Sequence, residues 1–291
     1  MPERGSRPGS DELLVVAAGV LTTVQDRGRV GLAHLGVPRA GALDAPAAAL
    51  GNRLVGNHAD AAVLELTLGG LRAFNRGTGR WAALTGAPVD ALAGRAVPFA
   101  EPFWWARDAV LEVGRPRDGV RVYLAMAGGI AVAPVLGSRS TDTLAWVGPP
   151  RVTDGTRLPL GRPGPDVRPQ PLDTPPARRV GAIRLTTGPQ ADWFSDVPTG
   201  RGWTVRPDSD RVGLRLDGEP LTRIREGELP SEGMVLGAVQ VPPSGLPIVF
   251  LADHPPTGGY PVVGIVHPDD LWLCAQLRLG EPVAFAPAGA R

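Results

Sequence analysis

Glycine and proline recur along the whole chain, and their spacing limits the folds open to it. The 291 residues include 39 glycines and 32 prolines. Both residue types interrupt helices and favour turns. They separate apolar runs that are mostly too short for helices, so we expect many short strands joined by tight turns. The chain is therefore predicted to be mainly β, and its length suits about two domains.

Alternating apolar and polar residues predict strands in both halves of the chain. Residues 63–68 place three leucines on one face, and residues 121–126 alternate in the same way. Residues 213–217 alternate in the second half. Residues 237–241 and 247–251 flank a Pro-Pro-Ser-Gly-Leu turn, which is typical of a hairpin.

Two helices are predicted among these strands. Asp44 is a suitable N-cap for a helix over residues 45–55, which a Gly-Asn pair ends. A second helix is expected over residues 270–279, where Gly280 ends it. Cys274 shares an apolar face of this helix with two leucines, so we expect the only cysteine to be a core residue.

Composition also predicts the domain boundaries. Residues 1–11 are polar and are expected to be a disordered lead, and residues 161–180 are rich in proline and arginine, as in a linker or long surface loop. An N-terminal β domain over 12–160 and a C-terminal β domain over 181–288 are therefore predicted.

The charged residues exclude several classes of function. The formal net charge is +1 and no stretch is strongly basic, so neither nucleic acid nor an anionic membrane is an expected partner. All 30 basic residues are arginine. Without lysine there is no Schiff-base lysine and no P-loop lysine, so any phosphate must be held by arginines or backbone amides.

The remaining composition favours an intracellular protein without metal. The four histidines are far apart in sequence and there is one cysteine, so no metal site and no disulfide framework is predicted. The first twelve residues lack an apolar signal segment, and the longest apolar run, residues 13–21, is too short to span a bilayer. We therefore expect a cytoplasmic location.

Polar side chains crowd between glycines over residues 22–44. Gln25, Asp26 and Arg29 supply hydrogen-bond donors and acceptors there, and the glycines allow the backbone to turn tightly beside a ligand. This pattern is typical of a binding loop. The alternative is that an Asp–Arg pair and backbone hydrogen bonds only lock the turn.

A second dense segment, residues 252–261, follows an apolar strand. Asp253 is expected at the strand end, facing a glycine loop whose amides could polarise a carbonyl or a phosphate; the alternative is a structural hairpin loop. Glu232 precedes a neighbouring strand and is expected to face the same pocket. Residues 136–142 form a third polar run, which suits recognition of oxygen atoms or, alternatively, a solvated turn with an Asx-type cap.

Many short segments spread over residues 13–286 together resemble one known family. These segments are 22–29, 36–44, 52–57, 64–65, 84–87, 123–130, 136–142, 209–213, 231–233, 237–243 and 253–261. The family comprises proteins known as allophanate hydrolase subunit 2 or as the C subunit of 5-oxoprolinase, and the A half of the urea carboxylase carboxyltransferase domain.

The resemblance implies a fold and an activity. The fold would be mainly β with a cyclophilin-like β-barrel architecture, in two strand-rich halves with a few short helices. The chain would be one subunit of an ATP-dependent 5-oxoprolinase, which converts 5-oxoproline, ATP and water to glutamate, ADP and phosphate. Mg²⁺ would be held by the nucleotide. The implied partners are a companion of the B type, also known as the subunit 1 type, and a third 5-oxoprolinase subunit.

Two other functions remain open on the same resemblance. One is the carboxyltransferase component of a biotin-dependent urea carboxylase or allophanate hydrolase-type system, with biotin on a separate carrier. The other is a non-catalytic regulator of the companion protein.

One segment departs from the family pattern. The family typically has Arg-Gln-Thr after the aspartate, whereas this chain has His254, Pro255 and Pro256 before Thr257. Two prolines stiffen the loop and remove donors, so the substrate contacts there are expected to differ and the substrate stays open.

The residues and the resemblance together predict one cleft. The predicted catalytic residues are Asp253 and Asp26. The predicted substrate- or nucleotide-binding residues are Gln25, Arg29, Asp44, Ser138, Arg139, Ser140, Asp142, Arg211, Glu232, Thr257, Gly258, Gly259 and Tyr260.

Overall fold

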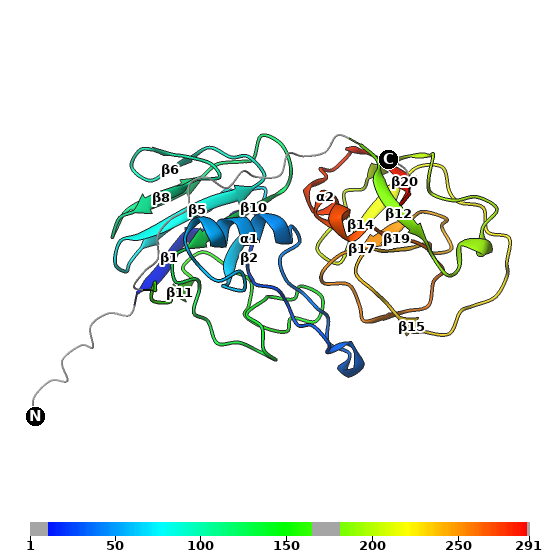
Figure 1. Ribbon diagram of the computed structural model, residues 1–291, viewed down its shortest axis with the longest axis horizontal. Coiled ribbons are helices and arrows are strands. Elements are labelled where there is room, and N and C mark those ends of the chain that lie inside the picture. Colours follow the sequence, from blue (N-terminus) through cyan, green and yellow to red (C-terminus); the bar gives the residue numbers. More distant parts are fainter. Residues whose placement is uncertain (1–10, 165–180, 290–291) are drawn as a thin grey trace, which may run out of the picture. The chain divides into compact units, whose positions relative to one another are not determined.

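Short strands carry most of the regular structure of this protein (Figure 1). The computed structural model describes residues 11–164 and 181–289. They divide into two units. The described part of the first unit comprises residues 11–26, 46–135 and 149–164, and that of the second comprises residues 27–45, 136–148 and 181–289.

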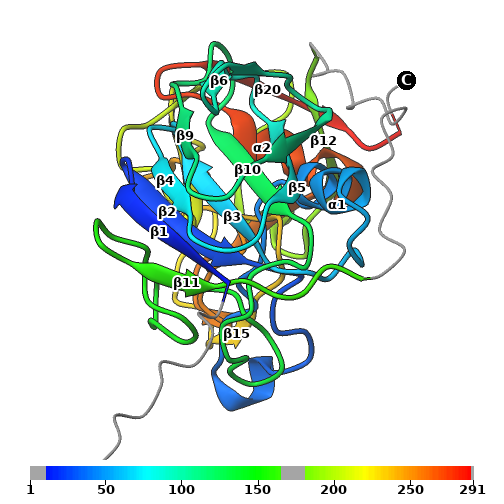
Figure 2. The same ribbon diagram turned by 90° about the vertical axis from the view of Figure 1, so that its left-hand side faces the viewer.

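Two antiparallel sheets form the first unit (Figure 2). One has the order β11-β1-β4-β9-β6-β7: Arg157–Pro159, Glu12–Ala17, Arg72–Asn75, Val110–Val113, Ala91–Leu92 and Ala96–Val97. The other has the order β2-β3-β10-β5-β8: Leu21–Gln25, Val63–Thr67, Arg121–Met126, Arg80–Gly86 and Pro102–Trp105. Both sheets contribute to one apolar core that includes Leu13, Leu66 and Trp105.

The predicted strands and first helix of this unit are confirmed. β3 pairs with β10, with Leu64 opposite Leu124. The helix α1 (Ala45–Leu54) approaches β5 closely, because a Cβ atom on Gly51 would lie 3.1 Å from Thr85 Oγ1. The Thr85 hydroxyl donates to the Ala47 carbonyl at 2.7 Å, so glycine at this position lets the helix pack on the sheet.

A closed barrel forms the second unit. Its strand order is β12-β19-β16-β17-β14-β13-β20: Ile183–Thr187, Val262–Val266, Ala238–Gln240, Ile248–Phe250, Gly213–Asp217, Gly202–Val205 and Pro282–Pro287. The predicted hairpin is present as β16 and β17, with Val239 opposite Val249. A mainly β fold with a barrel and a few short helices is therefore confirmed.

Three further small elements complete the helical part of the second unit. They are η1 (Ala33–Leu35), η2 (Ala191–Trp193) and η3 (Pro268–Asp270), which leads into α2 (Leu271–Gln276). The predicted helix over 270–279 is shorter, because the backbone at Leu277 is extended and the Gly280 amide donates to the Val205 carbonyl. Cys274 is buried as predicted, and burial raises the pKa of its thiol to about 12.

Two segments from the first half of the chain belong to the barrel unit. We call Arg27–Ala45 loop A and Leu136–Gly148 loop B. The predicted domains, 12–160 and 181–288, are contiguous, so both loops depart from them. Backbone pairing contributes to this arrangement, since the Ala40 amide donates to the Ala252 carbonyl at 2.9 Å.

Some predictions fall on segments that the structure does not describe. Residues 1–10 of the expected lead and residues 165–180 of the expected linker lie outside the described residues. Among the residues that are described, no helix is long and apolar enough to cross a membrane.

Candidate functional site

Arg211 and Asp253 form a buried ion pair in the second unit. Arg211 lies just before β14 and Asp253 just after β17, and these two strands pair antiparallel with Gly213 opposite Phe250, which brings the two residues together. Arg211 Nε donates to Asp253 Oδ2, and Nη2 donates to Oδ1, each at 2.9 Å. Both side chains are almost fully buried. The pair has the bidentate geometry that makes arginine–carboxylate contacts strong.

This pair also connects loop A and loop B to the barrel. Arg211 Nη2 donates to the Gly41 carbonyl in loop A at 2.8 Å. The Thr143 amide and hydroxyl in loop B donate to Asp253 Oδ2 at 2.9 and 2.7 Å. The Asp253 carboxylate thus accepts four hydrogen bonds within the protein. This geometry supports a positioning role, while the predicted catalytic role of Asp253 stays a prediction.

Arg29 makes a second buried connection between the loops. Its Nη2 donates to the Ser140 carbonyl at 2.6 Å. Only glycine at position 148 leaves room for this contact, because a Cβ atom there would lie 2.2 Å from Ser140 O and 2.3 Å from Arg29 Nη2. Its φ of +100° also favours glycine. The guanidinium group predicted to bind ligand is therefore turned toward the protein's own backbone.

Hydrogen bonds within loop B define its path. Ser138 Oγ accepts from the Ser140 amide at 3.0 Å. Asp142 accepts from the Leu144 and Ala145 amides, each at 2.9 Å. These contacts match the Asx-type cap that the sequence left as an alternative. Arg139 is only half-buried.

Asp44 connects loop A to α2. Its Oδ2 accepts from Gln276 Nε2 at 2.7 Å, and both side chains are buried. Arg29, Asp44, Ser140, Asp142, Arg211 and Asp253, all predicted to be site residues, are thus buried in the same unit.

The glycine loop after Asp253 pairs with the segment that contains Glu232. β15 (Glu232–Gly233) and β18 (Thr257–Gly258) are antiparallel partners. Glu232 is exposed and accepts from Gln190 Nε2 at 3.2 Å. The buried Gln240 donates to the Tyr260 carbonyl at 3.0 Å and leaves no room for a side chain at Gly258. Glu232 is thus adjacent to the glycine loop, while the pocket expected to contain both stays a prediction.

His254 was absent from the predicted site, yet it has the chemistry of an acid–base group. Its ring stacks on Phe250, with centroids 5.5 Å apart. Nδ1 lies 2.7 Å from the Pro255 carbonyl oxygen; a carbonyl only accepts, so Nδ1 carries the proton and Nε2 the lone pair of the neutral ring. Burial, with a smaller effect from Arg39, lowers the pKa of His254. The sequence did contain one signal for His254, because this residue lies in the segment that departs from the family pattern.

Gln25 and Asp26 belong to the first unit, unlike the other predicted residues. Gln25 is buried at the end of β2, and its Nε2 donates to Thr23 Oγ1 at 3.0 Å. In the same sheet the Tyr123 hydroxyl donates to the buried Glu65 at 2.7 Å. Glu65 fell in a segment of the family pattern, but this buried polar pairing was not predicted.

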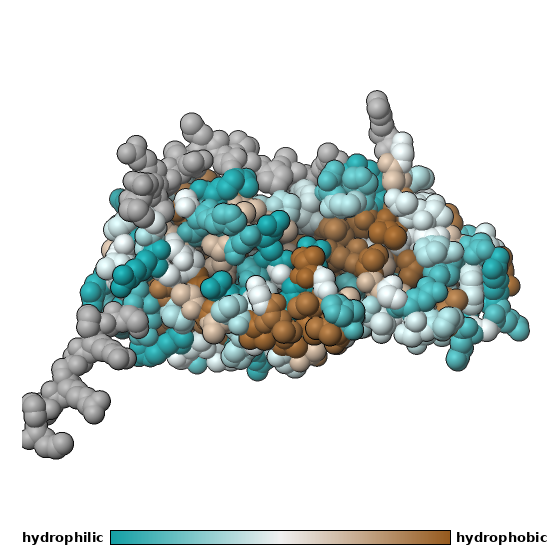
Figure 3. All heavy atoms as spheres, turned by 60° about the horizontal axis from the view of Figure 1, so that its bottom comes forward, coloured by the Kyte–Doolittle hydropathy of each residue, from teal (hydrophilic) through white to brown (hydrophobic). Residues whose placement is uncertain are grey.

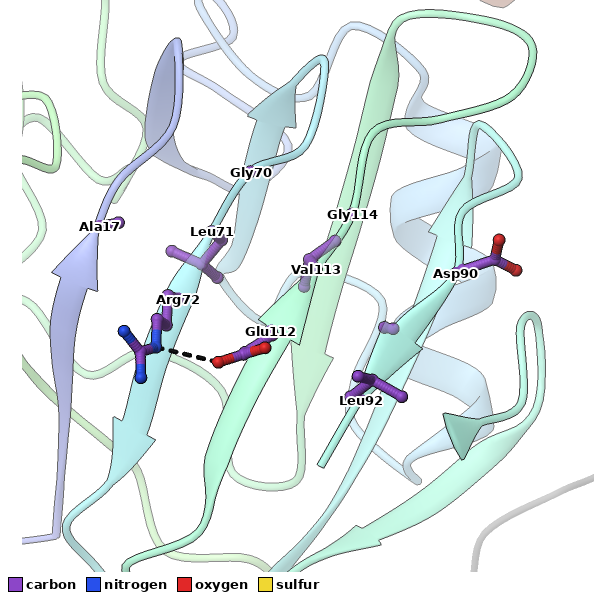
Figure 4. Close-up of a pocket in the computed structure, with 10 residues that line it drawn as sticks. Ala17, Gly70, Leu71, Arg72, Asp90, Leu92, Glu112, Val113 and Gly114 are labelled. Carbon is purple, nitrogen blue, oxygen red and sulfur yellow. Dashed lines mark ion pairs between the residues drawn. The ribbon is translucent and has the colours of Figure 1, made fainter. Parts of the chain in front are cut away.

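A surface hollow of about 570 Å³ lies on the other sheet of the first unit (Figure 4). Arg72 and Glu112 form an ion pair within it, with Nε and Oε1 3.0 Å apart. None of the predicted site residues lines this hollow. No group of three or more metal-ligating side chains is present in the described part of the chain.

Known proteins similar to this chain identify its family. The family described as "carboxyltransferase domain, subdomain A and B" matches residues 35–287. The chain belongs to this family. The C subunit of Escherichia coli 5-oxoprolinase is 39% identical over 94% of this chain and 90% of that protein. The urea amidolyase of Saccharomyces cerevisiae is 30% identical, but the match covers only 16% of that protein.

Solved structures of proteins similar to this chain share its fold. The structure of TTHA0988 has a TM-score of 0.85 and 40% identity; the match covers 96% of this chain and 57% of that chain. The Kluyveromyces lactis urea amidolyase has a TM-score of 0.90 and 29% identity, covering 97% of this chain and 19% of that chain. The resemblance inferred from the sequence is confirmed.

Proposed function

We propose that this protein is the C subunit of an ATP-dependent 5-oxoprolinase that acts with companion subunits. The observation that carries the proposal is the similarity to the C subunit of the Escherichia coli enzyme, which extends over nearly the full length of both chains. The C subunit of Haemophilus influenzae 5-oxoprolinase is also 32% identical over 90% of this chain. Correspondence along whole chains supports an equivalent subunit rather than a shared domain alone.

The chemistry requires an activated lactam. The amide carbonyl of 5-oxoproline is unreactive, so its oxygen would attack the γ-phosphorus of ATP and release ADP. Water would then add to the carbon, and the C–N bond would break to give glutamyl phosphate and the free amine. A second water would hydrolyse this acyl phosphate to glutamate and phosphate. This chain can contribute groups that hold anions, orient the lactam and carry protons, and the companion subunits would supply the rest.

Arginines must take the place of lysine in holding phosphate. Arg29 and Arg211 donate to acceptors inside the protein. Arg39 is exposed beside His254. We therefore assign anion binding on this chain to Arg39 and the amides of the 257–259 loop. Mg²⁺ would be held by the nucleotide phosphates.

His254 is the group we propose for proton transfer. Its neutral ring offers Nε2 as an acceptor at neutral pH, because the Pro255 carbonyl fixes the proton on Nδ1. Asp253, held by Arg211 and Thr143, would position His254 through the backbone of the loop they share.

The proposal is tested with the chain co-purified with its companion subunits. Phosphate and glutamate are measured with ATP, with and without 5-oxoproline. Equal release of both products that depends on 5-oxoproline is the expected result. A complex that hydrolyses no 5-oxoproline would contradict the proposal.

A carboxyltransferase is the second candidate, favoured by the description of the matching family. The chain contains no lysine, so biotin would be attached to a separate carrier. Transfer of CO₂ from carboxybiotin to urea, without turnover of 5-oxoproline, would favour this function. Tight binding to a companion with no turnover of any small amide would favour the remaining alternative, a non-catalytic regulator of the companion protein.

A further inference from the structure

Large apolar side chains stand exposed on loop A and loop B. The lower side of Figure 1 carries the blue η1 helix of loop A, and Figure 3, which brings that side forward, shows brown side chains gathered there. We call the exposed apolar residues of these loops the loop surface; they are Val30, Leu35, Leu136, Leu144 and Trp146. Exposed apolar patches on a folded protein commonly mark interaction sites.

The loop surface is fixed rather than adaptable. Arg29 connects the two loops through Ser140, and the Arg211–Asp253 pair connects each loop to the barrel. A surface that is already ordered loses little conformational entropy on binding. This rigidity suits a stable protein partner.

The backbone of loop B is strained where it presents these side chains. Trp146 has a φ of +57° and Leu136 a φ of +51°, in the left-handed region that bulky residues rarely occupy. Trp146 is nevertheless 57% exposed, so its side chain gains little from packing within the chain. Strain of this kind is typical of functional segments, and tryptophan is enriched among the residues that dominate interfaces.

The charges on the two loops indicate the kind of partner. The loops contain four arginines and two aspartates. Both aspartates are buried, with Asp44 bonded to Gln276 and Asp142 to loop B amides. Arg27 is exposed and Arg139 half-buried, and both also interact within the protein. A complementary surface would be apolar at its centre and carry carboxylates at its edge.

We propose that the loop surface is where the companion protein docks, through an apolar face edged by carboxylates. This inference rests on the proposed function. The chain spans 90% of a protein named as a subunit, so its companions would be separate chains. In TTHA0988 the matching part is 57% of one longer chain, so there the corresponding unit is joined covalently to further protein. A separate companion needs a non-covalent surface instead.

Two variants of the full chain test the surface. Trp146→Gly removes the side chain and relieves the positive φ, so the melting temperature should be no lower than that of the unmodified chain. Leu144→Ser removes a neighbouring apolar contact. We expect each variant to weaken binding of the companion, measured by calorimetric titration, by at least about tenfold.

Matched controls lie elsewhere on the chain. Trp104→Ala removes a tryptophan that is 55% exposed on β8, and Leu279→Ser an exposed leucine after α2. We expect both controls to bind the companion as the unmodified chain does. If Trp146→Gly and Leu144→Ser also bind normally while the complex hydrolyses 5-oxoproline, the docking surface is wrong and the proposed function stands.

The other outcomes separate the two proposals. If the unmodified chain binds no companion and shows no 5-oxoproline turnover with it, both proposals are wrong. If the chain alone sediments as a dimer and Trp146→Gly as a monomer, a second copy occupies the loop surface, which overturns the companion as its partner.

Discussion

Asp253 and Arg211 place opposite charges where water has almost no access. Burying charge is costly, and the mutual attraction of a pair offsets that cost only with good geometry and additional hydrogen bonds. Here the bidentate contact, Thr143 and Gly41 supply both. The pair is therefore an anchor whose loss leaves a buried, poorly compensated charge.

Asp253→Asn is predicted to destabilise the fold by about 3–5 kcal/mol, as expected for breaking a buried ion pair. The amide NH₂ of the new side chain would also face donors of Arg211 or Thr143. Denaturant unfolding measures the free energy. The matched control is Asp208→Asn, which breaks an exposed pair with Arg206 that also measures 2.9 Å and should have little effect. Equal effects of the two substitutions on the free energy of unfolding would contradict the anchoring role of the Asp253–Arg211 pair.

His254 predicts how stability depends on pH. Burial lowers its pKa in the folded protein below the ordinary value of 6.5, so below pH 6.5 the unfolded chain binds more protons. Stability from this residue is therefore present above pH 6.5 and is lost as the pH falls toward the folded pKa, by at most about 1.4 kcal/mol per pH unit for one proton.

The measurement for His254 is denaturant unfolding between pH 7.5 and the acid limit of the fold. His254→Gln should flatten the acid dependence, whereas His34→Gln, at an exposed residue of loop A, should leave it unchanged. If the free energy of unfolding of His254→Gln falls with acid as steeply as that of the unmodified chain, groups other than His254 cause the pH dependence.

Loop B depends on one glycine for its contact with loop A. Gly148 permits both the positive φ and the Arg29–Ser140 hydrogen bond. Gly148→Ala should cost about 1–2 kcal/mol for the left-handed backbone and a further ~1–3 kcal/mol for the clash. Gly200→Ala is the control, with a φ of +76° but open space around a Cβ atom. Unfolding free energies that fall equally would show that the Arg29 contact is unimportant.

The elements of this fold could be predicted where the signal is local. β3, β10, β14 and the β16–β17 hairpin follow alternation that is complete within a few residues. α2 is shorter than predicted, because a contact of Gly280 with β13 redirects the chain. Alternation also could not show that Glu65 is buried, since its partner Tyr123 lies on the neighbouring strand β10, 58 residues further along the chain.

For the candidate site, too, contacts between residues that are far apart in sequence could not be predicted. The resemblance pointed to Arg211 and Asp253, but not to their mutual contact or to Thr143, because residues 143 and 253 are 110 positions apart. His254 was missed as a site residue, because the tautomer and the lowered pKa follow from burial and one backbone carbonyl. Neither the tautomer nor the direction of the pKa shift can be predicted from residue identity alone.

The molecule is organised as units that are discontinuous in sequence. Loop A and loop B leave the first unit's strands and fold with the barrel, because buried arginines and carboxylates hold them there. Composition predicts domain boundaries where a chain is rich in proline and arginine. It cannot predict that two segments from the first half of the chain fold with the second unit. The loops should therefore open together with the barrel.

Amide hydrogen exchange tests this expectation. The Ala40 amide donates to Ala252 and the Thr143 amide to Asp253, so both should exchange as slowly as the amides of β14 and β17, through one cooperative opening. In Asp253→Asn both should exchange faster while the first unit's β3 and β10 keep their protection. Loop amides that exchange rapidly in the unmodified chain, beside a protected barrel, would show instead that loop A and loop B open independently of the barrel.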